Sequence, residues 1–200
     1  MDASTQWTEK NATMSIKSEK QKMLDGEMYN AMDPELVDGR KKAREHLHRF
    51  NNEQDPAVRD SILKELIGHH AEKSYIEPPF RCDYGSNIYY GKSFYSNFGC
   101  VMLDVCDIKI GENVMFGPNV QVYTATHPIC PEERKTGEYG KPITIGDNVW
   151  IGGGAIINPG VTIGEGTTIG SGSVVTKDIP PYVVAVGNPC RVIKQVERKQ

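Results

Sequence analysis

The sequence predicts a mainly β fold, a solenoid of short parallel strands that follows an N-terminal helical segment. The first observation is a repeat of six residues along much of the second half of the chain. The second is the number of glycines in that repeat, which an α-helix would not tolerate. The third is the helical spacing of apolar residues in the first part of the chain. A repeat this short, sustained over this length, is typical of a solenoid.

The helical segment is expected between residues 18 and 76, after polar residues 1–17 that we expect to be disordered. Helix-start signals precede its apolar stripes. These signals are Ser18 with Gln21, Asp33 before Pro34, and Asp55 before Pro56. The expected buried stripes are Leu36, Ala43, Leu47 and Phe50, followed by Val58, Ile62, Leu66 and Ile67.

The solenoid domain is expected from residue 77 to residue 200. Its clearest units are IGENVM, FGPNVQ and VYTATH, then, after an interruption, IGDNVW, IGGGAI, INPGVT, IGEGTT, IGSGSV and VTKDIP. We expect the opening residue of each unit to point inward. Glycine and asparagine should occupy the corners, where a positive φ costs them little. Unrelated glycine-rich hairpins are the alternative, but their turns would not recur every six residues.

The composition suits one globular unit and argues against several classes of function. The chain has 200 residues, 38% of them hydrophobic, and a net charge of −3, which gives no reason to expect nucleic acid as a partner. No apolar run approaches the roughly 20 residues of a membrane helix, and the N-terminus lacks an apolar signal core. The 5 cysteines are an odd number without close metal spacing, which favours reduced thiols. We therefore expect a cytoplasmic protein.

Several motifs together identify a resemblance that covers roughly residues 20 to 195. They are EPPFRCDYGSNI, NFGCVMLDVC, YTATHP, GKPITIGDNVWIGGGAIINPGVTIG, VVTKDIPPYVVAVGNPCRVI and the helical MLDGEMYNAMDPEL. The combination resembles the maltose and galactoside O-acetyltransferases, a family of hexapeptide-repeat acyltransferases. The resemblance implies a left-handed parallel β-helix, acetyl-CoA as co-substrate and no metal. It also implies a homotrimer with active sites between chains, and a sugar acceptor such as maltose, glucose or a galactoside.

His127 is the expected catalytic residue. It is the one histidine of the glycine-rich half, and it stands where VYTATH ends and the repeat stops. The neutral imidazole of an ordinary histidine is available at pH 7 to take a proton from a hydroxyl. The family's catalytic histidine falls in the same T-x-H-P setting, which adds to this interpretation. The alternatives are a histidine that only caps a corner, and a nucleophilic Cys130, which would need a base and an activating environment.

The interruption after His127 is PICPEERKTGEYGKP, residues 128–142. It is too polar and irregular to form a coil, so we expect a loop that leaves the solenoid beside the active site. The alternative is a tolerated insertion without a role.

For the sugar acceptor, the resemblance implies three polar side chains: Asn97, Asp83 and, from the helical segment, Arg40. Side chains of this kind exchange hydrogen bonds with hydroxyls. Asp104 is a fourth candidate, inferred from its polarity within an apolar run, and a corner-turn role is equally compatible. Trp150 either packs at the solenoid edge or lines the acceptor pocket.

For acetyl-CoA, the chain has no phosphate-binding loop of a known nucleotide-binding type. By resemblance, the backbone amide of Gly153 faces the thioester carbonyl. Further positions match the pantetheine and nucleotide path or the phosphates: Ser171, Thr176, Lys177, Arg191 and Lys194. A solvated cluster of C-terminal charges is the alternative for Arg191 and Lys194.

Two other classes of function are weighed against acetyl transfer. A γ-carbonic-anhydrase-like zinc enzyme shares the solenoid but needs three histidines converging from the coils, and this solenoid offers only His127. The histidines of the helical segment are expected to be surface or packing residues; they are His46, His48, His69 and His70. A non-catalytic scaffold would not need the histidine, the loop and the basic tail together.

Overall fold

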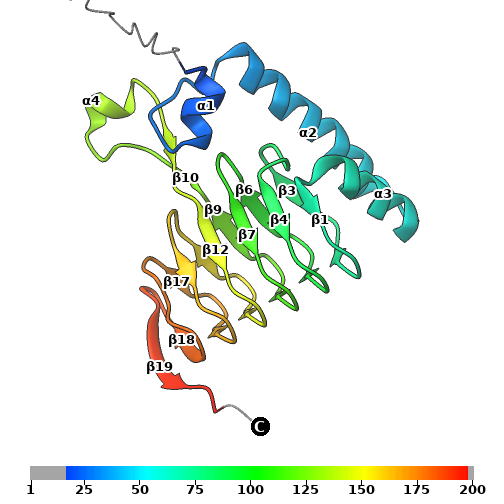
Figure 1. Cartoon of the computed structure of the whole chain (residues 1–200), viewed down its shortest axis with the longest axis vertical. Helices are drawn as coiled ribbons and strands as arrows, with labels where there is room; N and C mark the ends of the chain where they lie inside the picture. The colour runs from blue at the N-terminus through cyan, green and yellow to red at the C-terminus, as the bar shows by residue number, and fades with distance from the viewer. Residues whose placement is uncertain (1–16, 198–200) are drawn as a thin grey trace, which may run out of the picture.

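The computed structural model describes residues 17–197 and shows a β-solenoid with helices at its N-terminal end (Figure 1). The expected disorder of residues 1–17 therefore lies, except for Lys17, outside the described residues. The solenoid is preceded by α1 (Glu19–Leu24), α2 (Pro34–Asn52) and α3 (Pro56–Leu66). In the described part of the chain, no helix is long and apolar enough to cross a membrane.

The predicted start signals form the caps of these helices. Ser18 Oγ accepts from the amide of Gln21 at 3.1 Å. The carboxylates of Asp33 and Asp55 accept the amides two residues later at 3.0 and 2.8 Å, each with a proline in the first turn. Because these bonds satisfy amides that lack a partner within the helix, the sequence defines where each helix begins.

The buried stripe of α2 is as predicted, whereas that of α3 differs at one position. Leu36, Ala43, Leu47 and Phe50 are all buried. In α3, Val58 is 42% exposed, and Leu63 is buried together with Ile62 and Leu66. The reason is that α3 packs between α2 and the first strand of the solenoid, so it buries the side between those two neighbours.

The solenoid is a prism with three parallel sheets as faces, which confirms the predicted fold class. Face 1 consists of β1 (His69–His70), β4 (Ile88–Tyr90), β7 (Ile108–Ile110), β12 (Ile143–Ile145) and β15 (Thr162–Ile163). Face 2 consists of β2 (Tyr75–Ile76), β5 (Tyr95–Ser96), β8 (Met115–Phe116), β13 (Trp150–Ile151), β16 (Thr168–Ile169) and β18 (Val183–Val186), with β19 (Arg191–Gln195) antiparallel at its end. Face 3 consists of β3 (Arg81–Cys82), β6 (Val101–Leu103), β9 (Gln121–Tyr123), β14 (Ile156–Ile157) and β17 (Val174–Val175).

Each coil visits face 1, face 2 and face 3 in turn, and the six-residue register explains how the coils stack. The first and fifth residues of a unit are buried, as Ile145 and Val149 show. The fourth residue takes the positive φ at the corner, 57° at Asn148 and 69° at Gly154. The glycine at the second position of the unit is required for a different reason. A Cβ on Gly152 would lie 2.5 Å from the Ser171 amide nitrogen of the next coil. Glycine therefore serves close stacking at one position and backbone conformation at another.

The solenoid begins earlier than the expected boundary at residue 77. The helices end at Leu66, and β1 already pairs with β4 from His69 onward. This first coil lacks the glycine-rich pattern, and Lys73 takes the positive φ of 57° that asparagine or glycine takes at most of the later corners. Without that signature, periodicity could not reveal it.

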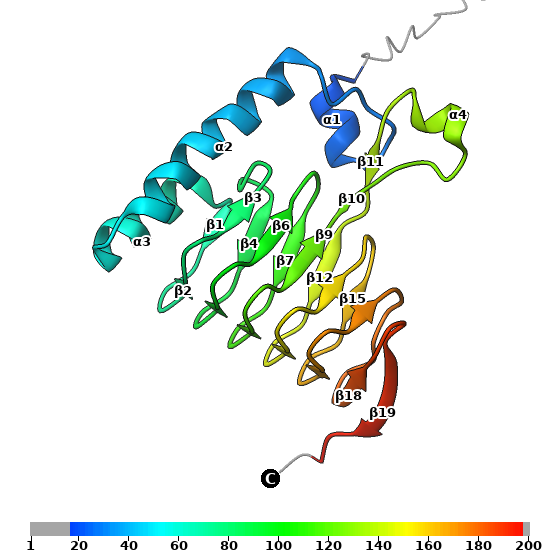
Figure 2. The same ribbon diagram turned by 180° about the vertical axis from the view of Figure 1, so that it is seen from behind.

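The expected loop leaves the solenoid as a hairpin. Its arms are β10 (Ala125–Thr126) and β11 (Tyr139–Gly140), which pair antiparallel, and α4 (Pro131–Arg134) lies at its tip. Figures 1 and 2 show the hairpin projecting from the prism with α1 beside it. A second, small hydrophobic core joins the N-terminal segment to the coils next to the hairpin; it contains Met23, Tyr29, Leu36, Tyr84 and Val105.

Candidate active site

The hairpin places His127 opposite an acidic residue. Thr126 pairs with Tyr139, so the next pair in the same antiparallel register is His127 and Glu138. His127 Nε2 lies 3.5 Å from Glu138 Oε2, and the histidine side chain is 51% exposed. The imidazole is therefore open to a substrate on one side and faces a carboxylate on the other.

Glu138 is in turn held by Tyr29 of the N-terminal segment. The Tyr29 hydroxyl donates to Glu138 Oε1. The backbone amide of Tyr29 also donates to the Glu138 carbonyl, at 3.0 Å. Burial, and then the Glu138 carboxylate, raise the pKa of Tyr29, so its hydroxyl stays protonated and remains a donor. Sequence reasoning missed both residues, because their contact joins positions 109 apart.

Asp83 and Arg40, both expected at the acceptor site, lie near this group. Burial raises the pKa of Asp83 and the Glu138 charge adds to that rise, while Arg40 opposes it. Arg40 donates from Nη1 to the Tyr84 hydroxyl and from Nη2 to the Ala31 carbonyl, each at 2.6 Å. Arg40 is thus fixed by two hydrogen bonds, and its charge acts on the neighbouring Asp83 carboxyl group.

Asp104 does not fit the expected role of an acceptor ligand. Its side chain is fully buried and accepts backbone amides from Asp83 at 3.0 Å, Tyr84 at 2.9 Å and Asn87 at 3.2 Å. Burial raises the pKa of Asp104 to about 7 despite these bonds. All of its contacts serve the turn that carries Asp83, so the alternative of a corner-turn residue is the correct one.

A second group of predicted residues lies on another edge of the prism. The corners between face 2 and face 3 stack in a column that we call the glycine edge, formed by Asn97, Pro118, Gly153 and Ser171. The column is held by backbone bonds: the Gly154 amide donates to the Pro118 carbonyl at 2.8 Å, and the Gly172 amide donates to the Gly153 carbonyl at 2.9 Å. Asn97 Oδ1 accepts the Phe98 amide at 2.8 Å.

The amide of Gly153 is available as a donor. The neighbouring amides of Gly152 and Gly154 are used in stacking the coils, with bonds of 2.8 Å to Ile169 and Pro118. The Gly153 amide has no hydrogen-bond partner among residues 17–197. A peptide N–H that is free at a rigid corner can stabilise a developing oxyanion.

His127 stands on a different edge from Gly153. The corners between face 3 and face 1 form what we call the acidic edge, with Asp83, Asp104, His127, Thr176 and Lys177. Face 3 separates it from the glycine edge. One chain therefore does not bring His127 and Gly153 together, although it does bring together His127, Asp83 and Arg40.

The remaining expected donor residues are exposed. Ser171, Thr176 and Lys177 are solvent-accessible at the corners after β16 and β17. Arg191 and Lys194 are exposed in β19, and Arg191 Nη1 donates to the Cys190 carbonyl at 2.8 Å. These positions run along the C-terminal coils, toward the opposite end of the solenoid from the helices (Figure 2).

Trp150 and Cys130 both lie outside the group of residues around His127. Trp150 is 51% exposed and points outward from face 2, paired with Met115 and Thr168, so it lies neither in the core nor beside His127. Cys130 caps α4 in the exposed part of the hairpin, with its Sγ 3.6 Å from Glu132 Oε2. A carboxylate neighbour does not create the electropositive environment that activates a thiolate.

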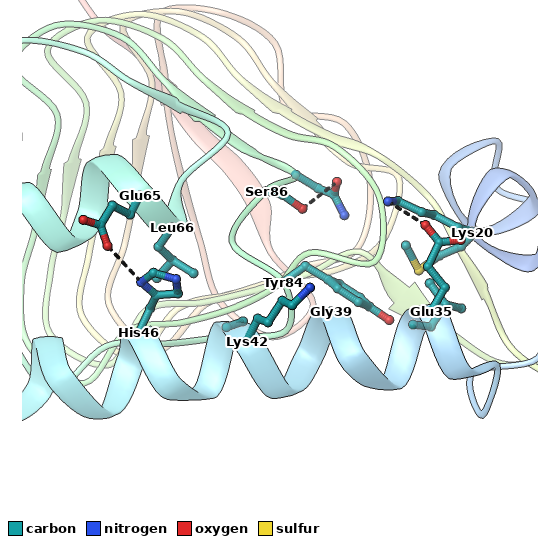
Figure 3. A pocket seen from close by; sticks show the side chains of 13 residues that line it. Lys20, Glu35, Gly39, Lys42, His46, Glu65, Leu66, Tyr84 and Ser86 are labelled. Atoms are coloured by element: carbon teal, nitrogen blue, oxygen red, sulfur yellow. Dashed lines mark hydrogen bonds and ion pairs between the residues drawn. The ribbon is translucent and has the colours of Figure 1, made fainter.

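A cavity of about 270 Å³ lies between α2 and the first coils, away from these residues. Figure 3 shows two ion pairs in its lining, between Lys20 and Glu35 at 3.0 Å and between His46 and Glu65 at 3.6 Å. None of the predicted site residues lines it. A larger cavity, of about 490 Å³, lies against the hairpin and is lined by Pro128 and Tyr139 on either side of His127 and Glu138.

The arrangement of His, Cys, Asp and Glu side chains bears on the possibility of a zinc site. Across the part of the chain that the structure describes, no three His, Cys, Asp or Glu side chains form a group that could hold a metal ion. Of the histidines in the first part, His46 contacts Glu65, and His70 lies 3.0 Å from Asp60. These contacts connect α2, α3 and the first coil, which is a packing role.

Comparison with known proteins matches both parts of the chain. Residues 22–71 match the model of the maltose acetyltransferase hexapeptide capping motif. Residues 142–177 match the bacterial transferase hexapeptide model of six repeats. The N-terminal segment that contains Tyr29 and Arg40 thus forms one recognised unit, and the later coils form another.

Similar proteins cover nearly the whole chain. A galactoside O-acetyltransferase of Escherichia coli is 44% identical, over 86% of this chain and 86% of its own. The crystal structure of a maltose O-acetyltransferase from Clostridium difficile is 54% identical with a TM-score of 0.89, covering 91% of this chain and 99% of that one. A hexapeptide-repeat acetyltransferase of Vibrio cholerae, complexed with acetyl-CoA, is 38% identical with a TM-score of 0.86, covering 91% and 100%. The chain belongs to the maltose and galactoside O-acetyltransferase family of hexapeptide-repeat acyltransferases.

Proposed function

We propose that this acetyltransferase moves the acetyl group of acetyl-CoA to a hydroxyl of a sugar such as maltose, glucose or a galactoside, with His127 as general base. The observation that carries the proposal is the exposed His127, which faces Glu138 near the polar pair Asp83 and Arg40. The similar proteins named above act on galactosides or maltose or hold acetyl-CoA, which supports the same chemistry.

The reaction needs one proton transfer in each direction. The acceptor hydroxyl gives its proton to His127 as its oxygen attacks the thioester carbonyl. A C–O bond forms, the C–S bond breaks, and the departing CoA sulfur takes the proton back from the imidazolium. No covalent enzyme intermediate is required, which agrees with the carboxylate surroundings of Cys130.

The negative charge on the carbonyl oxygen would be stabilised by the Gly153 amide, which is free of partners in the described chain. Preorganised donors of this kind stabilise the transition state because they need no rearrangement. Since His127 and Gly153 occupy different edges, we propose a homotrimer in which the acidic edge of one chain faces the glycine edge of its neighbour. Ser171, Thr176, Lys177, Arg191 and Lys194 would then follow the CoA chain and its phosphates.

The acceptor would lie at the acidic edge. Asp83 accepts and Arg40 donates hydrogen bonds, the pair of functions that sugar hydroxyls need. Asn97 would join them from the neighbouring chain. The hairpin 128–142 would form a wall of this site, because it extends from His127. We also propose that the enzyme acts in the cytoplasm, in keeping with the free thiols of Cys82, Cys100, Cys106, Cys130 and Cys190.

The test is the release of free CoA thiol by a His127→Ala variant supplied with acetyl-CoA and a panel of sugars. We expect kcat to fall roughly a hundredfold or more, the order expected for loss of a general base, while CoA binding persists. His48→Ala, which removes an exposed histidine of α2, is the matched control and should retain full activity. Full activity of His127→Ala would exclude this mechanism. If the wild-type enzyme acetylated none of the sugars in the panel, that result would exclude this substrate class.

A further inference from the structure

We propose that Glu138 and Tyr29 are positioning residues for His127, so that the N-terminal helical segment completes the catalytic hairpin of the solenoid. The inference rests on the proposed role of His127 as the base. It assigns a catalytic purpose to a contact between two parts of the chain that the hexapeptide repeat does not connect.

The first step is the register of the hairpin. β10 and β11 pair as far as Thr126 and Tyr139, and the following residues, His127 and Glu138, meet through their side chains at 3.5 Å. This distance is at the long end for a hydrogen bond, as is common for catalytic groups before substrate binds. The hairpin by itself leaves the Glu138 side chain free to choose among rotamers.

The second step is the contact with Tyr29, which removes that freedom. The Tyr29 ring is 2% exposed, and its hydroxyl donates to Oε1 of Glu138. Backbone bonds of 3.0 and 3.4 Å join the same two residues in both directions. A Cβ on Gly137 would lie 2.6 Å from the Tyr29 carbonyl, so only glycine allows the segments to approach this closely.

The third step is what the carboxylate does for the imidazole. With Oε1 held by Tyr29, Oε2 is directed at His127 Nε2. A carboxylate at one ring nitrogen favours the tautomer with its proton there and leaves Nδ1 as the base. It also stabilises the imidazolium that forms when the acceptor proton is taken, which is a contribution to the transition state rather than to binding.

The surrounding charges agree with this assignment. Burial raises the pKa of Asp83 and of Tyr84, and the Glu138 charge adds to both rises. Arg40 opposes both rises, and Arg44 opposes that of Asp83. Glu138 therefore lies in the same polar group as Asp83 and Arg40.

The experiment measures kcat and KM for both substrates in Glu138→Gln and Tyr29→Phe, in the full chain. We expect kcat to fall about tenfold or more in Glu138→Gln and several-fold in Tyr29→Phe, with both KM values within about twofold of the wild type. Glu112→Gln, which changes an exposed glutamate at a corner between face 1 and face 2, is the control and should keep its kcat. Glu138→Asp should recover part of the lost rate.

The decisive arm repeats both substitutions in a His127→Ala background. If Glu138 and Tyr29 act through His127, they lower the residual rate no further, because their effects are not additive with its loss. A further tenfold loss in that background, or an unchanged kcat in the single Glu138→Gln variant, overturns the inference. Tyr29→Phe keeps the buried ring, so it still tests the contact if Glu138→Gln does not fold. A fully active His127→Ala would instead refute the proposed function.

Discussion

The two edges that border face 3 consist of different kinds of chemical groups. The glycine edge is formed mainly by backbone and small residues, and the functional group that we propose there is the peptide amide of Gly153. The acidic edge carries ionisable side chains, among them Asp83 and His127, and it is the edge from which the hairpin and the contact to Tyr29 arise. The comparison teaches that a repeat can present free amides at its own corners, whereas an oriented base requires the chain to leave the repeat.

The difference extends to how each edge is stabilised. At the glycine edge, every corner rests on the next coil through bonds such as that from the Gly154 amide to Pro118. At the acidic edge, the corner of Asp83 rests on a buried carboxylate, Asp104, and the hairpin rests on a segment far away in sequence. The first arrangement is local and regular; the second depends on tertiary contacts.

The largest expected effect comes from removing the donor of the glycine edge. Gly153→Pro deletes the amide proton; its Cβ would lie 3.0 Å from the Pro118 carbonyl oxygen of the preceding coil, a close contact that Gly153→Ser shares. We expect kcat to fall about 10²–10³-fold, the usual order for the loss of one oxyanion donor. Gly153→Ser keeps the amide and is the control. Equal rates for the two variants, measured by thiol release, would remove Gly153 from the mechanism.

The next effect concerns the stability of the acidic edge. In Asp104→Asn, the new NH₂ group cannot accept the Asn87 amide, so the free energy of unfolding at pH 5 should drop by about 1–3 kcal/mol. The KM for the acceptor should be unchanged well below the melting temperature. A large rise in that KM without loss of stability would return Asp104 to the acceptor site.

The same residue gives a pH dependence. The folded-state pKa of Asp104 is about 7, raised by burial, against roughly 3.9 when unfolded. Between these values the folded protein binds the extra proton, so this contribution to stability is present below about pH 4 and lost as the pH rises to about 7. Denaturant titrations from pH 4 to 8 should therefore show the advantage of the wild type over Asp104→Asn shrinking as the pH rises. A constant or growing advantage would contradict this account.

The smallest effect is expected at the C-terminal strand. Arg191→Ala should raise the KM for acetyl-CoA about tenfold with kcat unchanged, since one charge-assisted contact to phosphate is lost. Lys92→Ala, an exposed charge in an earlier coil, is the control. If Arg191 belongs only to a solvated charge cluster, both variants will keep the wild-type KM.

The repeating part of this molecule could be predicted well from the sequence, because the burial and backbone conformation of each residue depend only on its position within the six-residue unit. The inward side chains of Ile145 and Val149 and the corner at Asn148 follow from position in the unit alone. The helix caps at Asp33 and Asp55 are equally local. Where the repeat lacks its glycines, at Lys73, the first coil was not recognised and the boundary was placed too late.

The candidate site was predictable only in part. His127 can be identified from the sequence because it interrupts a pattern. Glu138 is one acidic residue among several in its loop, and only its hydrogen bond with Tyr29, which the sequence does not reveal, distinguishes it. Asp104 could not be distinguished from an acceptor ligand, because a buried turn carboxylate and a substrate-binding carboxylate look alike in sequence. The separation of the two edges follows from the order of the faces, which only the stacked coils reveal.

The most direct test of the central claim, that the base and the amide donor of one active site come from different chains, is complementation between two inactive variants. His127→Ala and Gly153→Pro carry different affinity tags, are co-expressed, and are purified for complexes that hold both. In each trimer that holds both variants, one of the three sites, about a third, joins an intact His127 from one chain to an intact Gly153 from its neighbour. We expect recovery of about that share of the wild-type rate. Mixed complexes as inactive as either parent would show that each site draws both residues from one chain.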